Sequence, residues 1–244
     1  MKRAGAALAI ALFGLIPGSA CSSDDDATAE PASPCAAFAA APAPAYEVEP
    51  FASVAGVRQI ASATRAYGLD GRGSLHVLGP QASVAIELGE AARAVAVSPD
   101  GAALYALRGL GALELVRFES TDGGATFDAA RVAVIAAITP AGARSDGGAL
   151  AVEQSGVLWV ATPDGTTSSA DDPASRLGKV LRVAPGAEPT LFARGFRSPS
   201  ALDLDPELGD VWVGDTGERG AEIDRVLEGK RYGWPQLDGL RNPR

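Results

Sequence analysis

Residues 177–235 read LGKVLRVAPGAEPTLFARGFRSPSALDLDPELGDVWVGDTGERGAEIDRVLEGKRYGWP. Three short runs in this stretch, 179–183, 201–204 and 210–213, alternate apolar and polar side chains, as half-buried β-strands do. Pro, Gly or Asp follows each run, and these are the residues that tight turns require. The stretch therefore predicts short strands that form a rigid scaffold, with chemistry carried by the loops between them.

A strand–turn–strand unit recurs along the chain at a spacing of roughly 50 residues, which is typical of propeller blades. The turn glycines of three copies are Gly101, Gly156 and Gly209. The paired runs are 94–97 with 104–107, 149–152 with 158–160, and 201–204 with 211–213. A β-sandwich with coincidental spacing is the alternative. We favour an all-β propeller of about four blades because the units share turn chemistry as well as spacing.

Two further segments refine this expectation. Residues 120–127, STDGGATF, resemble the Asp-box turn of sialidase-like propellers, in which Asp and Gly build the turn and the aromatic ring packs beneath it. Nearer the N-terminus, 57–64 and 74–78 are predicted as the first strands, with 69–73 as the turn between them. His76 lies inside the second of these strands, where a histidine is more often structural than catalytic.

The composition limits the classes of partner. Aspartate and glutamate total 30 against 21 lysines and arginines, a net charge of −9 over 244 residues. This charge argues against binding to a nucleic-acid backbone. One His, two Cys and one Met leave little material for a soft-metal site.

The N-terminus has the features of a targeting segment. Lys2 and Arg3 precede an apolar run at 6–16, and Cys21 follows a Pro-Gly-Ser-Ala sequence. We interpret 1–20 as a lipoprotein signal peptide, with Cys21 acylated as the mature N-terminus in a bacterial cell envelope. An ordinary cleaved signal with Cys21 incidental is the alternative.

The remaining chain divides into two further predicted parts. Residues 21–45 are rich in Ala, Pro, Ser and Asp, a composition that cannot bury a core, and are predicted to form a disordered tether. Residues 46–244 are predicted to form the propeller.

Several motifs of the opening stretch, in order, resemble the glucose/sorbosone dehydrogenase family. They are the strand at 177–182, the Gly-x-Arg-x-Pro turn at 195–199, Glu-Ile-Asp at 222–224 and Tyr-Gly-Trp-Pro at 232–235. The family comprises soluble quinoprotein sugar dehydrogenases and relatives of the Hedgehog-interacting protein. Its fold is a six-bladed propeller, so the resemblance implies that this chain holds part of the fold and is a C-terminally truncated member.

The resemblance also implies a reaction and its base. In the quinoprotein relatives a histidine abstracts the sugar hydroxyl proton while a hydride passes to pyrroloquinoline quinone (PQQ), and an aspartate orients that histidine. The matching positions here are Ser145 and Asp164. Serine alone is no base at neutral pH. Without the histidine, we favour the alternative that Asp164 is a simple turn residue.

The resemblance places a quinone contact in the 195–199 turn. The family's arginine and its neighbour correspond to Arg197 and Ser198, where the family has asparagine at the second position. A planar guanidinium binds carboxylates through two parallel hydrogen bonds, and PQQ carries several carboxylates. The alternative is a structural loop arginine bonded to backbone carbonyls.

A calcium site is implied in the loop that follows. The family's loop supplies backbone carbonyls to a Ca²⁺ ion, and the matching candidates are Thr216, Gly217 and Glu222. Glu222 could instead pin the loop structurally, and Glu218 could form a solvent-facing ion pair with Arg219.

These residues leave two functions open. One is a PQQ-dependent sugar dehydrogenase-like protein with little or no sugar oxidation, because Ser145 occupies the histidine position. The other is a non-catalytic propeller that binds a sugar, another small molecule or a protein at the cell surface. A sialidase-like hydrolase needs an arginine cluster and a tyrosine nucleophile, and we find no such constellation.

We predict that a lipid on Cys21 holds the mature protein on the membrane, since more than one acyl chain makes such anchoring stable. In a bacterial host fed labelled palmitate, the wild type and the control variant Cys35→Ser should both be labelled and sediment with membranes. Cys21→Ser should be unlabelled and remain in the supernatant. Equal partitioning of wild type and Cys21→Ser would refute the lipoprotein interpretation.

Overall fold

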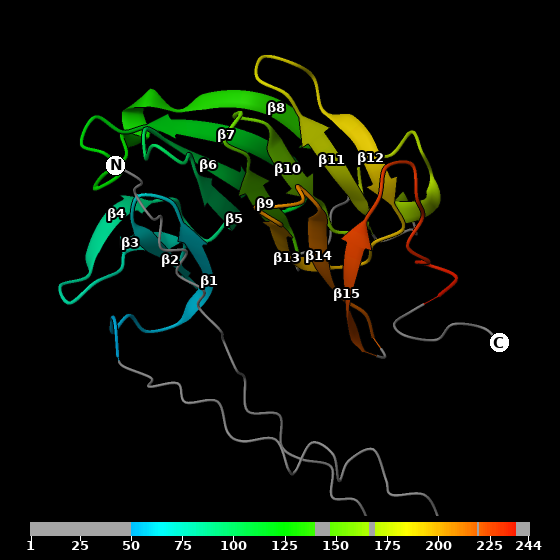
Figure 1. Ribbon diagram of the computed structural model, residues 1–244, viewed down its shortest axis with the longest axis horizontal. Helices are drawn as coiled ribbons and strands as arrows, with labels where there is room; N and C mark the ends of the chain where they lie inside the picture. The colour runs from blue at the N-terminus through cyan, green and yellow to red at the C-terminus, as the bar shows by residue number, and fades with distance from the viewer. Residues whose placement is uncertain (1–49, 140–146, 166–168, 219, 238–244) are drawn as a thin grey trace, which may run out of the picture. The chain divides into compact units, whose positions relative to one another are not determined.

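Short antiparallel strands make up nearly all of the regular structure in the computed structural model (Figure 1). The structure describes residues 50–139, 147–165, 169–218 and 220–237, all within the unit Glu49–Arg244. The strands are β1 (Val57–Ser62), β2 (Ala66–Asp70), β3 (Ser74–Val77), β4 (Ser83–Glu87), β5 (Ala92–Val97), β6 (Ala103–Arg108), β7 (Leu113–Glu119), β8 (Ala133–Thr139), β9 (Ala149–Val152), β10 (Leu158–Ala161), β11 (Lys179–Val183), β12 (Thr190–Arg194), β13 (Pro199–Leu204), β14 (Val211–Thr216) and β15 (Ala221–Val226). Two 3-10 turns join them, η1 (Ala129–Arg131) and η2 (Ser169–Asp171). Within these ranges no helix has the length and apolar character needed to cross a membrane.

The strands form four sheets in which neighbours along the chain pair with one another. We call them blades 1 to 4: β1–β4, β5–β8, β9–β12 and β13–β15. The first strands of the blades, β1, β5, β9 and β13, contact one another in succession (Figure 1). Sheets of consecutive antiparallel strands, repeated side by side through their first strands, are the arrangement of a β-propeller. The predicted all-β propeller of about four blades is therefore confirmed.

Each pair of neighbouring blades encloses its own hydrophobic core. The middle strand β6 shows how this works, because its successive side chains point to opposite faces of the sheet. Leu104 packs in the core shared with blade 1, whereas Leu107 packs in the core shared with blade 3. Both side chains are fully buried. Blades 2 and 3 are thus apolar on both faces, and each face packs against a neighbouring blade.

The predicted Asp-box turn lies between β7 and β8. The Asp122 carboxylate accepts hydrogen bonds from the backbone N–H of Thr126 over 2.9 Å and from its hydroxyl over 2.7 Å. Phe127 is buried, with its ring centre 6.1 Å from that of Tyr67. The Tyr67 hydroxyl in turn donates to the Gly124 carbonyl over 2.9 Å. The segment therefore has its expected architectural role and ties blade 2 to blade 1.

The sequence analysis did not name every strand, and β2 shows why. The turn predicted at 69–73 begins too early, because Leu69 and Asp70 are the last residues of β2 (Ala66–Asp70). Tyr67, Gly68 and Leu69 are all buried. A strand that is covered on both faces has no polar alternation, and so it lacks the signal on which the prediction relied.

Candidate functional site

Three loops of blades 3 and 4 meet at one end of their sheets: the loop after β10, the β12–β13 connection and the β14–β15 connection. Backbone hydrogen bonds join them. The Asp164 N–H donates to the Arg197 carbonyl over 2.8 Å, and the Thr216 N–H donates to the Ser198 carbonyl over 3.1 Å. The structure thus brings together predicted site residues from three separate loops. They are Asp164, Arg197, Ser198 and Thr216. We call this group the three-loop site.

Asp164 is more than a turn residue. Its side chain is buried, with the residue 1% exposed. Oδ1 accepts hydrogen bonds from the Gly165 N–H over 2.7 Å and from the Ser169 hydroxyl over 2.8 Å. Oδ2 accepts from Trp234 Nε1 over 2.5 Å. The carboxylate therefore links the loop after β10 to a segment 70 residues further along the chain.

Arg197 is buried beside this carboxylate-bearing loop, with only 8% of the residue exposed. Its Nη2 donates to Glu218 Oε1 over 2.5 Å, and its guanidinium carbon lies 5.0 Å from the centre of the Trp234 ring. Its Nε is buried and has no hydrogen-bond partner within the described part of the chain. A buried donor without an acceptor costs about 1–3 kcal/mol, so this nitrogen favours a ligand acceptor.

Asp215 supports the backbone beneath Arg197, a role that no sequence motif indicated. Its Oδ2 accepts the Arg197 N–H over 2.8 Å, and its Oδ1 accepts the Ser198 N–H over 2.7 Å. Burial raises the pKa of this carboxyl above its ordinary value, although the two backbone donors act in the opposite direction. Strand periodicity could have indicated that Asp215 is buried, because alternate residues of a strand share a face. Asp215 lies on the same buried face of β14 as Val211 and Val213.

The predicted calcium ligands do not all occupy one turn. Thr216 is the last residue of β14, and the Gly217 N–H closes a tight turn by donating to the Gly220 carbonyl over 2.7 Å. Glu222 lies instead within β15, paired with Asp215 of β14. Among the residues that the structure describes, no group of three or more His, Cys, Asp or Glu could hold a metal ion. Calcium binding by this loop stays a prediction.

The Tyr-Gly-Trp-Pro motif, known from the sequence only as a family signature, brings the chain from blade 4 back to blade 3. The Tyr232 N–H donates to the Arg194 carbonyl over 2.9 Å, and the Trp234 N–H donates to the Gly195 carbonyl over 3.1 Å. The Tyr232 ring stacks on Phe196 at a centroid distance of 4.9 Å. These contacts position Trp234 between Asp164 and Arg197.

His76, the single histidine of the chain, lies outside the three-loop site. It belongs to β3 in blade 1, where its Nε2 lies 3.2 Å from Asp70 Oδ2. Both side chains are partly buried. This local pairing agrees with the structural role predicted for His76.

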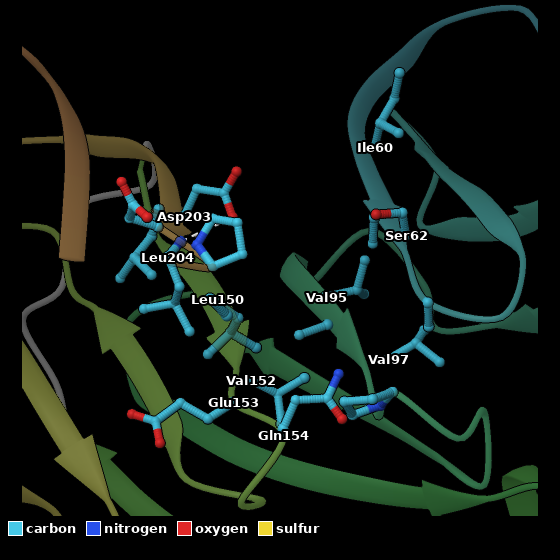
Figure 2. A pocket seen from close by; sticks show the side chains of 18 of the residues that line it. Ile60, Ser62, Val95, Val97, Leu150, Val152, Glu153, Gln154, Asp203 and Leu204 are labelled. Atoms are coloured by element: carbon cyan, nitrogen blue, oxygen red, sulfur yellow. Dashed lines mark hydrogen bonds between the residues drawn. The ribbon is translucent and has the colours of Figure 1, made fainter. Parts of the chain in front are cut away.

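A cavity of about 880 Å³ lies among the inner strands β1, β5, β9 and β13, away from the three-loop site (Figure 2). It is lined by the ends of these strands that lead into their following turns, including Val97, Val152 and Leu204. Its acidic Glu153 is already engaged, accepting from Trp159 Nε1 over 2.7 Å. None of the predicted site residues lines this cavity, so the three-loop site remains the candidate functional site.

Two predicted residues, Ser145 and Cys21, lie outside the described residues. The chain just after Ser145 nevertheless reaches the site, because the Gly148 N–H donates to the Pro199 carbonyl over 2.6 Å. A Cβ atom added at Gly147 would lie 2.9 Å from the Ser198 hydroxyl oxygen. The backbone that follows Ser145 therefore packs closely against the β12–β13 connection.

The sequence profile described as Glucose / Sorbosone dehydrogenase matches residues 104–242, which is more than half of the chain. The chain belongs to the glucose/sorbosone dehydrogenase family. The resemblance drawn from its motifs is thereby confirmed, and the match begins earlier than those motifs, in β6.

Individual relatives agree with this assignment. The aldose sugar dehydrogenase YliI of Escherichia coli (strain K12) is 28% identical over 105 residues, which cover 36% of this chain and 28% of that protein. The PQQ-bound aldose sugar dehydrogenase of Streptomyces coelicolor superposes with a TM-score of 0.66 at 19% identity, covering 78% of this chain and 66% of that one. The soluble aldose sugar dehydrogenase of Escherichia coli gives 0.62 at 17% identity, covering 73% and 62%. The chain thus spans less than two thirds of the length of these relatives, and the structural likeness supports the fold.

Replacing Asp215 by Asn should lower the free energy of unfolding by about 1–3 kcal/mol, because an amide oxygen can accept only one of the two backbone N–H groups and the other is left buried without an acceptor. The exposed Asp203→Asn is the control and should stay within ~0.5 kcal/mol of the wild type. Urea denaturation at pH 7 measures both. Equal midpoints for the two variants would show that the Asp215 carboxylate does not hold the Arg197 and Ser198 backbone.

Proposed function

We propose that the three-loop site is a quinone site of the sugar dehydrogenase type that retains an anion-binding arginine and does not oxidise sugars. The observation that carries the proposal is the buried Arg197 guanidinium, whose Nε lacks an acceptor among the described residues. Membership of the glucose/sorbosone dehydrogenase family and a relative described as PQQ-bound support the choice of ligand. A lipid on Cys21 would tether this propeller to a bacterial cell envelope.

The charge distribution around Arg197 fits a carboxylate-bearing quinone. Arg197 already pairs with Glu218, but the Glu218 side chain is 69% exposed. Glu218 can therefore move into water without becoming a buried, unpaired charge itself. A ligand carboxylate that also reaches the buried Nε could therefore replace Glu218, while the Trp234 ring keeps the guanidinium in place.

Among the residues that the structure describes at the site, we find no base for sugar oxidation. When bound, the quinone would accept a hydride, and the substrate hydroxyl must lose its proton in the same step. Ser145 cannot take that proton at neutral pH. His76 is paired with Asp70 in blade 1. Asp164 is almost fully buried, and both of its oxygens already accept hydrogen bonds. The site can therefore bind and orient an anion without completing the reaction.

Calorimetric titration of PQQ in the presence of Ca²⁺ tests the binding. Arg197→Ala should weaken binding by roughly 10- to 150-fold, the equivalent of losing about 1.5–3 kcal/mol of charge-assisted hydrogen bonding. Arg131→Ala, which removes an exposed arginine in blade 2, is the matched control and should bind as the wild type does. If Arg197→Ala and the wild type bind PQQ equally, Arg197 is not the anion contact.

We also expect no dye-coupled oxidation of glucose or other aldoses by the purified chain supplied with PQQ and Ca²⁺. General-base catalysis accounts for roughly 10²–10⁴-fold of such a rate, and no residue at the site fills that role. A quinoprotein sugar dehydrogenase assayed in parallel serves as the positive control. Robust turnover by the wild-type chain would contradict the proposal and make sugar oxidation its primary function.

A further inference from the structure

A buried lysine lies directly behind the three-loop site. Lys179, the first residue of β11, is 0% exposed. Its Nζ donates hydrogen bonds to the backbone carbonyls of Ser169 over 2.9 Å, Ala170 over 2.8 Å and Leu177 over 2.6 Å. All three N–H groups of the ammonium are thereby satisfied by backbone oxygens.

The three carbonyls belong to the two ends of one segment. Ser169 and Ala170 begin η2, whereas Leu177 immediately precedes the glycine before β11. A single ammonium therefore closes the loop made by 169–177. With an apolar side chain at position 179, the Ser169 and Ala170 carbonyls would keep backbone donors, the N–H groups of Asp172 and Gly195, but the link between the two ends of the segment would be lost.

The 169–177 segment contacts both Asp164 and the stretch that carries Trp234, the two neighbours of Arg197 at the site. The Ser169 hydroxyl donates to Asp164 over 2.8 Å. Asp171, two residues further on, accepts from Arg231 Nε over 2.7 Å and so ties the segment to the stretch that carries Trp234. If the 169–177 segment opened, Asp164 would lose one of its donors and Trp234 would lose an anchor.

We propose that Lys179 is a positioning residue of the three-loop site, whose side-chain amino group keeps the 169–177 segment closed and thereby fixes Asp164 and Trp234 around Arg197. The consequence for ligand binding rests on the proposed function. The closure of the segment does not, and it can be measured on the free protein.

The charges that surround Lys179 determine how this closure depends on pH. Burial lowers the pKa of Lys179 to about 8, against the opposing effect of the Asp164, Asp172 and Asp171 carboxylates, while Arg194 adds to the lowering. In an opened segment the amine would be hydrated, with a pKa near its ordinary value of about 10.4. Opening therefore takes up a proton between these two values. By linkage, opening becomes less favourable as the pH rises from about 8 to about 10 and is insensitive to pH below that range.

Hydrogen exchange at single amides tests the closure. The amides of Asp172, Ser175 and Gly178 donate within the segment or to the neighbouring Pro163. In Lys179→Met they should exchange more than tenfold faster than in the wild type, while amides of β6 and β7 in blade 2 keep their rates. Lys230→Met, at an exposed lysine, should change neither group. Unchanged exchange within the segment, or an equal rise throughout the propeller, would overturn the proposal.

A second measurement uses the wild type alone. It tests whether Lys179 closes the segment even if Lys179→Met does not fold. In the wild type, the opening constant of the segment, corrected for intrinsic exchange, should fall by up to about tenfold per pH unit above pH 8. The β6 and β7 amides should show no such trend. A flat profile at Asp172, Ser175 and Gly178 would show that opening does not release the Lys179 amino group into water, and would refute its role in closing the segment.

Titration with PQQ separates this proposal from the proposed function. If the wild type binds PQQ, Lys179→Met should bind it at least tenfold more weakly, and Lys230→Met should match the wild type. Undiminished binding by Lys179→Met would overturn the positioning role. If the wild type does not bind PQQ, the proposed function fails, and the exchange profile alone decides whether Lys179 closes the segment.

Discussion

The two inner blades of this propeller, blades 2 and 3, need a neighbour on each face, because side chains on both faces of their middle strands are apolar. Leu104 and Leu107 of β6 belong to different cores although they lie three residues apart. The packing therefore propagates from blade to blade through the inner strands. This arrangement leaves the connecting loops free to vary, and the three-loop site is built from such connections at one end of blades 3 and 4.

The site itself depends on buried charges, which a hydrophobic scaffold must satisfy one by one. Asp215 is held by two backbone donors, Asp164 by three donors, and Lys179 by three carbonyls. Only Arg197 retains a buried polar atom without a partner among these four described residues. In the proposed function, this nitrogen is the donor that a ligand carboxylate would satisfy.

Sequence patterns anticipated the parts of this structure that depend on local periodicity or on family motifs. The runs at 201–204 and 211–213 lie in β13 and β14, where more buried side chains alternate with exposed ones. β2 was not predicted because it is buried on both faces, so apolar and polar residues do not alternate along it. The roles of Asp215, Trp234 and Lys179 could not be predicted, since each arises from contacts between segments that only the fold brings together. Asp164 and Trp234, for example, are hydrogen-bonded although they lie 70 positions apart in the sequence.

The pairing of Arg197 with Glu218 has a consequence for selectivity among anions. Glu218 is attached to the same chain and stays near the guanidinium, so it acts as an internal competitor at a high effective concentration. A small monocarboxylate such as acetate offers the arginine no more than Glu218 already does. A rigid molecule with several carboxylates gains further contacts once it has displaced Glu218, and its binding is multivalent. At the proposed quinone site, the exposed glutamate would therefore select ligands by the number of their acidic groups rather than by their charge alone.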